Sequence, residues 1–203
     1  MGNGSNGPCG EVPPPTAHRP PPTVTDRLLA AVRTIPDFPS PGIAFKDLTP
    51  ILADPGLFAE ALDRLAAPWL NSGVTHVVGI EARGFWFGPA LAARLGVGFV
   101  PARKPGKLPA ATVQTTYALE YGEDAVELHA DAFAGAALAG RDAPRVLVHD
   151  DVVATGGTAA AVCALVARLG GRVVGMSLVL EIAALRGRAA LPDGVPVEAV
   201  LQV

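Results

Sequence analysis

Residues Val146 to Ala160 have the sequence "VLVHDDVVATGGTAA", which gives the strongest indication of the fold class. An apolar run leads to two adjacent carboxylates, Asp150 and Asp151, and "TGGT" follows after three more apolar residues. A run of alanines comes next, inside a segment that we expect to be helical from Thr158 to Leu169. A buried strand, a glycine turn and a helix in this order are typical of α/β folds.

The glycine turn has the chemistry of a phosphate site. Gly156 and Gly157 carry no Cβ atom, so their backbone N–H groups can approach an anion closely. The helix start adds free donors and the positive end of the helix dipole, while Thr155 and Thr158 add hydroxyl groups. The turn lacks the sequence of a P-loop or of a dinucleotide fold. This pattern therefore favours a single phosphate group.

The two acids need a separate explanation, because carboxylates beside a phosphate site repel the phosphate. Asp150 and Asp151 could accept hydrogen bonds from sugar hydroxyls, or they could bind a hard cation through oxygen. A sugar phosphate would satisfy both the acids and the turn. The alternative is that one Asp caps the turn and the glycines merely form it.

The rest of the chain predicts an α/β fold with a central, mainly parallel sheet that is flanked by helices. Continuous Val, Ile and Leu runs predict strands, and helical segments alternate with them. We expect strands at 75–80, 97–102, 145–150, 172–182 and 196–203, short strands at 117–122 and 125–130, and a loop at 103–116. We expect helices at 25–34, from Asp54-Pro55 onward, and at 88–96. Ligands of such folds bind beyond the carboxyl ends of the strands.

A second anion site is indicated by the charge distribution. No acidic residue lies between Glu81 and Glu120, although the protein has a net charge of −3. The interval holds the cations Arg83, Arg94, Arg103, Lys104 and Lys107. Three of these lie in "RKPGK" (103–107), which suits a pyrophosphate that a closing loop could grip. The alternative is a plain basic surface, which is our interpretation of Arg94.

Composition limits the remaining possibilities. A chain of 203 residues suits one domain, which we place at 23–203 after a disordered Pro/Gly-rich extension at 1–22. The mild negative charge argues against nucleic acid, and no apolar run has the length of a membrane span. Cys9 and Cys163 lie far apart in the sequence, so we expect neither a disulfide framework nor a cysteine-based metal site. We therefore expect a cytoplasmic location.

The acid pair and the glycine turn resemble the binding motif of type I phosphoribosyltransferases. Further segments are similar to the adenine phosphoribosyltransferases within that family and follow in the family's order. They are "IPDFPSPGIAFKDLTPIL" (35–52), "GIEARGFWFGPALA" (79–92), "RKPGKLP" (103–109), "LEYG" (119–122) and "EIAALRGR" (181–188). The resemblance implies the type I phosphoribosyltransferase fold, with a small hood and a flexible loop.

The resemblance also implies a reaction. Phosphoribose would pass from 5-phosphoribosyl 1-pyrophosphate (PRPP) to N9 of adenine, giving AMP and pyrophosphate, with Mg²⁺ bound mainly through PRPP. Asp150 and Asp151 match the acids that bind the ribose hydroxyls. The residues that match the 5′-phosphate loop are Ala154, Thr155, Gly156, Gly157 and Thr158. The residues that match the pyrophosphate contacts are Arg83, Arg103, Lys104 and Lys107.

The base-binding residues are implied in the same way. Phe45 matches the ring that stacks on adenine, and Ile182 matches the apolar residue on its other face. Ala44 and Lys46 flank Phe45, and the family usually has Arg at position 46. Glu120 and Tyr121 match the mobile hood, with Glu120 and Arg83 as catalytic candidates. The family forms homodimers, so the resemblance implies a homodimer.

Two other hypotheses of function compete with this one. One is transfer to another purine, such as hypoxanthine, xanthine or guanine. The other is a regulator that binds PRPP without catalysis. Two residues also keep a structural alternative: Phe45 could be plain core, and His149, where the family has an aliphatic residue, is most simply a buried and satisfied histidine.

Overall fold

The computed structural model describes residues 1, 24–119, 122–135 and 143–203. Its centre is a five-stranded sheet in which every strand pairing is parallel, in the order β4-β3-β7-β8-β9. The strands are β3 (His76–Ile80), β4 (Gly98–Ala102), β7 (Arg145–Val153), β8 (Arg172–Glu181) and β9 (Val197–Gln202). The predicted α/β fold with a central parallel sheet is confirmed. Strands β3, β7 and β8 are buried on both faces, which explains their unbroken apolar sequences.

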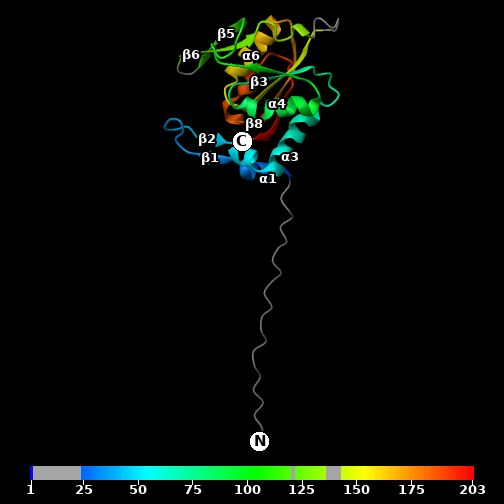
Figure 1. Ribbon diagram of the computed structural model, residues 1–203. Helices are drawn as coiled ribbons and strands as arrows, with labels where there is room; N and C mark the ends of the chain where they lie inside the picture. Colours follow the sequence, from blue (N-terminus) through cyan, green and yellow to red (C-terminus); the bar gives the residue numbers. More distant parts are fainter. Residues whose placement is uncertain (2–23, 120–121, 136–142) are drawn as a thin grey trace.

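Helices cover both faces of the sheet (Figure 1). One face packs against α1 (Val24–Ala31), α2 (Thr49–Ala53), α3 (Pro55–Ala66) and α4 (Gly84–Leu95). The other face packs against α6 (Gly157–Arg168). Short 3₁₀ turns lie at Ala67–Trp69, Ala183–Leu185 and Gly187–Ala190. No helix of the described residues is both long enough and apolar enough to cross a membrane.

Two antiparallel ribbons stand beside the sheet. One pairs β1 (Arg33–Ile35) with β2 (Phe45–Asp47), and the other pairs β5 (Thr112–Leu119) with β6 (Gly122–His129). Both project from the same side of the molecule, the left side in Figure 1. Val126 and Leu128 of β6 are buried in the core cluster that α6 also joins, so the hairpin is packed onto the fold at its base.

The caps of α3 and α4 follow from the sequence. Asp54 accepts hydrogen bonds from the backbone N–H groups of Gly56 and Leu57, and Pro55 occupies the first helical position, as predicted. Gly96 ends α4 in the left-handed region, with φ of 69°.

Three predictions about elements are wrong in part. The first helix ends at Ala31 rather than at Thr34, because Thr34 pairs with Lys46 in the β1–β2 ribbon. The predicted loop 103–116 includes the first half of β5, whose polar side chains hid a strand that cross-strand pairing stabilises. Strand β7 does not end at Asp150, where the predicted strand ended, since it continues to Val153.

Candidate active site

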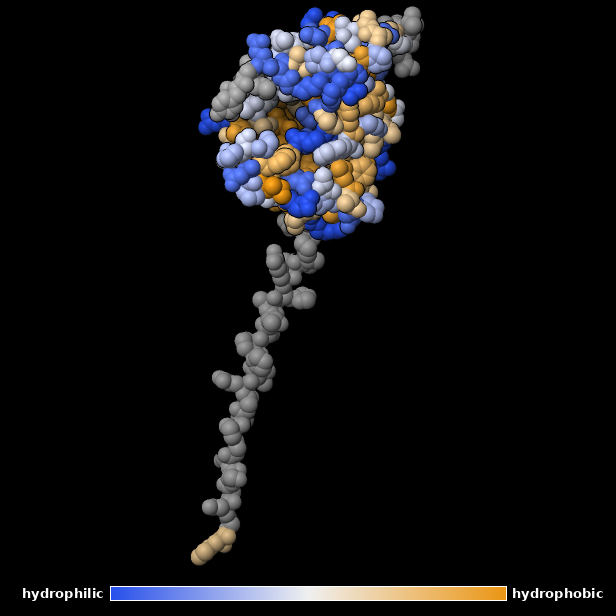
Figure 2. All heavy atoms as spheres, turned by 60° about the vertical axis from the view of Figure 1, so that its left-hand side comes forward, coloured by the Kyte–Doolittle hydropathy of each residue, from blue (hydrophilic) through white to orange (hydrophobic). Residues whose placement is uncertain are grey.

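A cleft of about 260 Å³ opens at the carboxyl ends of β3 and β7. Its lining includes the acid pair, the whole glycine turn, Arg83 and Lys104, so most of the predicted PRPP residues are brought together. Figure 2 shows the side of the molecule that carries the two ribbons, with a hollow whose rim holds both hydrophilic and hydrophobic residues. The hairpin contributes Tyr117 and Asp124 to the lining.

The glycine turn is shaped by a close contact with another segment. Gly156 has φ of 83°, and a Cβ atom there would lie 2.2 Å from the carbonyl oxygen of Gly187. A Cβ atom on Gly187 would in turn lie 2.4 Å from the carbonyl oxygen of Ala154. The two backbones therefore touch, and both positions require glycine.

The start of α6 is arranged as a donor site. Within the described part of the chain no side chain caps the first turn of α6, whose N-cap is Gly156. Its N–H groups therefore face the cleft together with Thr155 and Thr158, which are exposed and half-buried, respectively. Backbone donors at a helix N-terminus suit a phosphate group.

The segment that carries Gly187 is fixed by an ion pair. Arg188 donates from Nε and Nη2 to the two carboxylate oxygens of Glu181, at 2.7 Å each. Arg188 also donates to the carbonyl oxygen of Val197 at 2.8 Å. Because Glu181 ends β8 and is buried, this pair connects the segment that contacts the glycine turn to the sheet.

The acid pair is costly to keep ionised. Burial and the neighbouring charge of Asp151 raise the pKa of Asp150 well above its ordinary value. Burial also raises the pKa of Asp151, while the nearby Arg83 opposes that rise. Arg83 Nε lies 3.3 Å from Asp151 Oδ2, yet among the described residues that oxygen has no aligned hydrogen-bond donor. Buried carboxylate oxygens that lack hydrogen-bond donors suit a ligand whose hydroxyl groups can donate to them.

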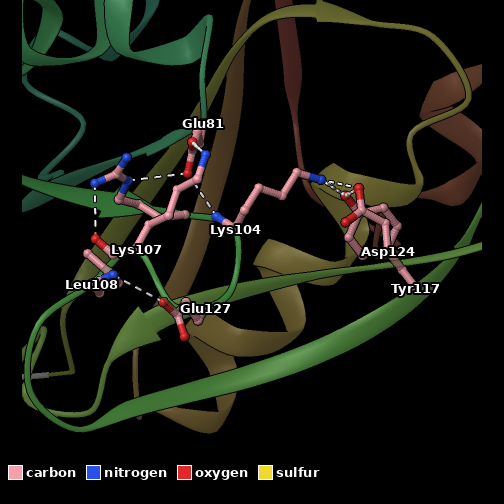
Figure 3. Close-up of polar contacts among 8 residues, drawn as sticks. Glu81, Lys104, Lys107, Leu108, Tyr117, Asp124 and Glu127 are labelled. Atoms are coloured by element: carbon pink, nitrogen blue, oxygen red, sulfur yellow. Dashed lines mark hydrogen bonds and ion pairs between the residues drawn. The ribbon is translucent and has the colours of Figure 1, made fainter.

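The basic loop, residues 103–108, is held by hydrogen bonds to acidic side chains (Figure 3). Glu81 accepts hydrogen bonds from Arg103 Nε at 3.2 Å, from the backbone N–H of Lys104 at 2.8 Å and from Lys107 Nζ. Burial opposes the charge of Glu81, but these bonds outweigh it and lower its pKa. Of the three predicted loop cations, only Lys104 reaches the cleft lining.

A second acid anchors the end of this loop. Glu127 is buried and accepts hydrogen bonds from the backbone N–H of Leu108 at 3.2 Å and from the Thr112 hydroxyl at 3.0 Å. Its backbone also exchanges two hydrogen bonds with that of Arg103. Both ends of the basic loop are therefore attached to β6.

The predicted base-binding residues lie outside the cleft lining but next to it. Arg83 places its guanidinium carbon 5.0 Å from the centre of the Phe45 ring, and Phe38 packs edge-on against that ring at 5.1 Å. Phe45 is half-buried and Ala44 is exposed, so Phe45 is not plain core. Lys46 donates to the Thr34 hydroxyl at 3.0 Å. Ile182 is half-buried, and its backbone N–H bonds to the carbonyl of Val153.

Some predictions about single residues have other outcomes. Glu120 and Tyr121 lie outside the described residues, as does the extension beyond Met1. His149 is fully buried, and its Nδ1 lies 3.0 Å from the carbonyl oxygen of Ser177. Its Nε2 has no partner among the described residues, so the expectation of a satisfied histidine is wrong. Arg94 pairs with Asp63 on the surface, in agreement with a plain surface role.

Sequence reasoning missed the acids and the glycine that support the site. Glu81 carried a signal, because it immediately precedes the acid-free interval. Asp124 had none until the hairpin register was known, in which Tyr117 and Asp124 are paired across the strands. Among the described residues, no group of three or more acidic, histidine or cysteine side chains is placed to hold a metal ion.

Comparison with known proteins agrees with this geometry. The model of the phosphoribosyl transferase domain family matches residues 51–192. An adenine phosphoribosyltransferase of Synechococcus sp. is 51% identical over 175 residues, which cover 86% of this chain and 96% of that protein.

Solved structures give the same result. The crystal structure of adenine phosphoribosyltransferase from Rhodothermus marinus has a TM-score of 0.82 at 50% identity, covering 89% of this chain and 98% of that one. The enzyme from Saccharomyces cerevisiae, solved with adenine and an imino-altritol bisphosphate, has a TM-score of 0.80 at 39% identity, covering 88% and 98%.

Proposed function

This chain belongs to the adenine phosphoribosyltransferase family, and we propose that it transfers phosphoribose from PRPP to N9 of adenine, giving AMP and pyrophosphate. One observation carries the proposal. A single cleft holds a phosphate-type turn, an acid pair suited to sugar hydroxyls, and the cations Arg83 and Lys104. The identity of about one half to adenine-specific relatives supports adenine as the base.

Phosphoribose binds at the β7–α6 end of the cleft. The N–H groups from Gly156 onward and the hydroxyls of Thr155 and Thr158 donate to the 5′-phosphate, and Ala154 forms the start of the turn. Asp150 and Asp151 accept hydrogen bonds from the 2′- and 3′-hydroxyls. The sugar is thereby fixed at both ends, which orients C1′ toward the base.

Pyrophosphate leaves toward the cations. As the bond from C1′ to the pyrophosphate oxygen breaks, negative charge grows on the leaving group and positive charge on the sugar. Arg83 and Lys104 stabilise the growing negative charge, and Arg103 and Lys107 join them from the adjoining loop. The acid pair sits on the sugar side, where positive charge develops. This division of charge within one cleft favours transfer.

Adenine binds beside this cleft. Phe45 stacks on the base, with Ala44 and Lys46 presenting backbone groups to its edge and Ile182 covering its other face. The edge-on contact with Phe38 and the guanidinium of Arg83 support the ring of Phe45 in this role. Glu120 hydrogen bonds to adenine N7, and Tyr121 belongs to the hood that closes over the site.

Mg²⁺ would be held mainly through PRPP. The ion prefers oxygen ligands and keeps part of its water, and the cleft offers the carboxylate oxygens of Asp150 and Asp151 beside the space for pyrophosphate. When bound, it neutralises part of the leaving charge. A homodimer and a cytoplasmic location complete the proposal. Sedimentation velocity tests the former.

The proposal is tested by measuring both products of the reaction, AMP and pyrophosphate. Incubation with adenine, PRPP and Mg²⁺ should give AMP and pyrophosphate in equal amounts. Omitting adenine should abolish both products. Release of pyrophosphate without AMP would contradict the proposal, because it would show hydrolysis of PRPP rather than transfer.

A further inference from the structure

An acid lines the cleft beside Lys104, one of the cations proposed to bind pyrophosphate. Asp124 of β6 lines it together with Lys104 and Tyr117. Lys104 Nζ forms an ion pair with Asp124 and donates to the Tyr117 hydroxyl at 3.1 Å. Tyr117 in turn donates to Asp124 Oδ2 at 3.0 Å, so the three side chains form a closed ring of contacts (Figure 3).

The arrangement is built by the hairpin. Tyr117 and Asp124 are directly paired across β5 and β6, so their side chains project from the same face. The backbone N–H of Ala125 donates to Asp124 Oδ1 at 2.8 Å and steadies the carboxylate. The main chain of Lys104 is held separately by Glu81. Only the flexible side chain of Lys104 is therefore committed to Asp124.

Lys104 and Asp124 each stabilise the charged form of the other. The hydrogen bond from Lys104 is the main cause that lowers the pKa of Asp124, against its partial burial. Burial opposes the charge of Lys104, but the bonds to Asp124 and Tyr117 outweigh it and raise its pKa. Both side chains remain partly exposed, at 36% for Lys104 and 29% for Asp124. Such a pair is weak enough to be exchanged for a more highly charged partner.

We propose that Asp124 is a positioning residue that holds the Lys104 ammonium within the cleft and competes for it with the pyrophosphate group. This inference rests on the proposed function for the identity of the anion. Binding of pyrophosphate or PRPP breaks the Lys104–Asp124 pair, and departure of pyrophosphate restores it. Asp124 thereby weakens anion binding and assists release of the product.

The test compares four variants by titration calorimetry with magnesium pyrophosphate and with PRPP, in the absence of base. Asp124→Asn keeps the shape and an acceptor for Tyr117 but removes the competing charge. The matched control is Glu123→Gln, which removes the same charge from the exposed, opposite face of β6. Lys104→Gln and the double variant Lys104→Gln/Asp124→Asn complete a double-mutant cycle.

Asp124→Asn should bind both ligands about two- to fivefold more tightly, the range expected for a partly exposed ion pair. Its KM for PRPP should fall while its KM for adenine stays unchanged. Glu123→Gln should bind like the wild type. In the Lys104→Gln background, Asp124→Asn should give no gain, because there is no lysine left to release.

Weaker or unchanged binding by Asp124→Asn would overturn the inference. So would a gain that persists without Lys104, because it would come from the general loss of negative charge. The inference would also be overturned if no variant bound pyrophosphate. The AMP assay with the wild type decides the proposed function independently, since it requires no particular effect of Asp124.

Discussion

The carbonyl oxygen of Gly187 lies where a side chain on Gly156 would have to go, 2.2 Å from the position of a Cβ atom. The two residues are far apart in the sequence, yet their backbones form one unit under the proposed phosphate site. The shape of the glycine turn thus depends on the segment after β8 as well as on its own glycines. Substitutions in either segment, or at the buried charged groups beside them, should therefore change both the stability of the fold and the affinity for PRPP.

Gly156→Ala should lower the affinity for PRPP by at least about tenfold and destabilise the fold by more than about 1 kcal/mol. The new Cβ atom would displace Gly187 and distort the turn. Gly170→Ala is the matched control, because Gly170 has a similar φ of 79° and a Cβ atom there would meet nothing within 4 Å. Calorimetry and thermal unfolding measure both effects. Equal behaviour of the two variants would contradict the contact's importance.

Arg188→Met should destabilise the fold by about 3 kcal/mol, since it leaves the buried Glu181 carboxylate without its main partner. It should also weaken PRPP binding, because the Gly187 segment loses its attachment to the sheet. Adding Glu181→Gln should restore part of the stability by removing the unpaired charge. Denaturant titration measures the cycle. Strictly additive effects would show that the pair does not act as a unit.

Asp150→Asn should abolish most AMP formation and yet raise the melting temperature at pH 7. The pKa of Asp150 is raised in the folded state, so the folded protein holds that proton more tightly than the unfolded chain does. Acidification through the raised pKa therefore stabilises the wild type at this residue, and the advantage of the variant should shrink as pH falls. Melting curves between pH 4 and 8 test this. An advantage that grows on acidification would contradict it.

His149→Val should make the protein less sensitive to acid. Burial lowers the pKa of His149 to about 4, so the folded state resists protonation that the unfolded chain accepts near 6.5. The wild type therefore loses stability as pH falls from 6.5 toward 4, by up to about 3 kcal/mol at 1.4 kcal/mol per pKa unit. Unfolding free energies at pH 7 and pH 5 measure the difference. Identical losses in both proteins would contradict the account.

Much of the fold was predictable because its signals are local. The apolar runs of β3, β7 and β8 and the Asp54-Pro55 helix start are contained within a few residues each. The first half of β5 was missed because its stability comes from pairing with β6 rather than from an apolar pattern. The continuation of β7 through the acid pair likewise depends on its pairing with β8.

The candidate site divides in the same way. The acid pair and the glycine turn could be found because one short stretch holds them. The sequence could not reveal that Gly187 supports the glycine turn or that Asp124 pairs with Lys104. Each of these contacts joins segments that are distant in the sequence. The resemblance to a family named the ligands. The residues that support the glycine turn or compete with a bound anion could be identified only from the three-dimensional structure.

A competition between bases is the sharpest test of the proposed transfer to adenine. The protein is given PRPP, Mg²⁺ and an equal mixture of adenine, hypoxanthine and guanine, and the nucleotides formed are separated and quantified. We predict AMP as the dominant nucleotide, matched by an equal amount of pyrophosphate. Absence of AMP, or an excess of the hypoxanthine or guanine nucleotide over AMP, would contradict the account.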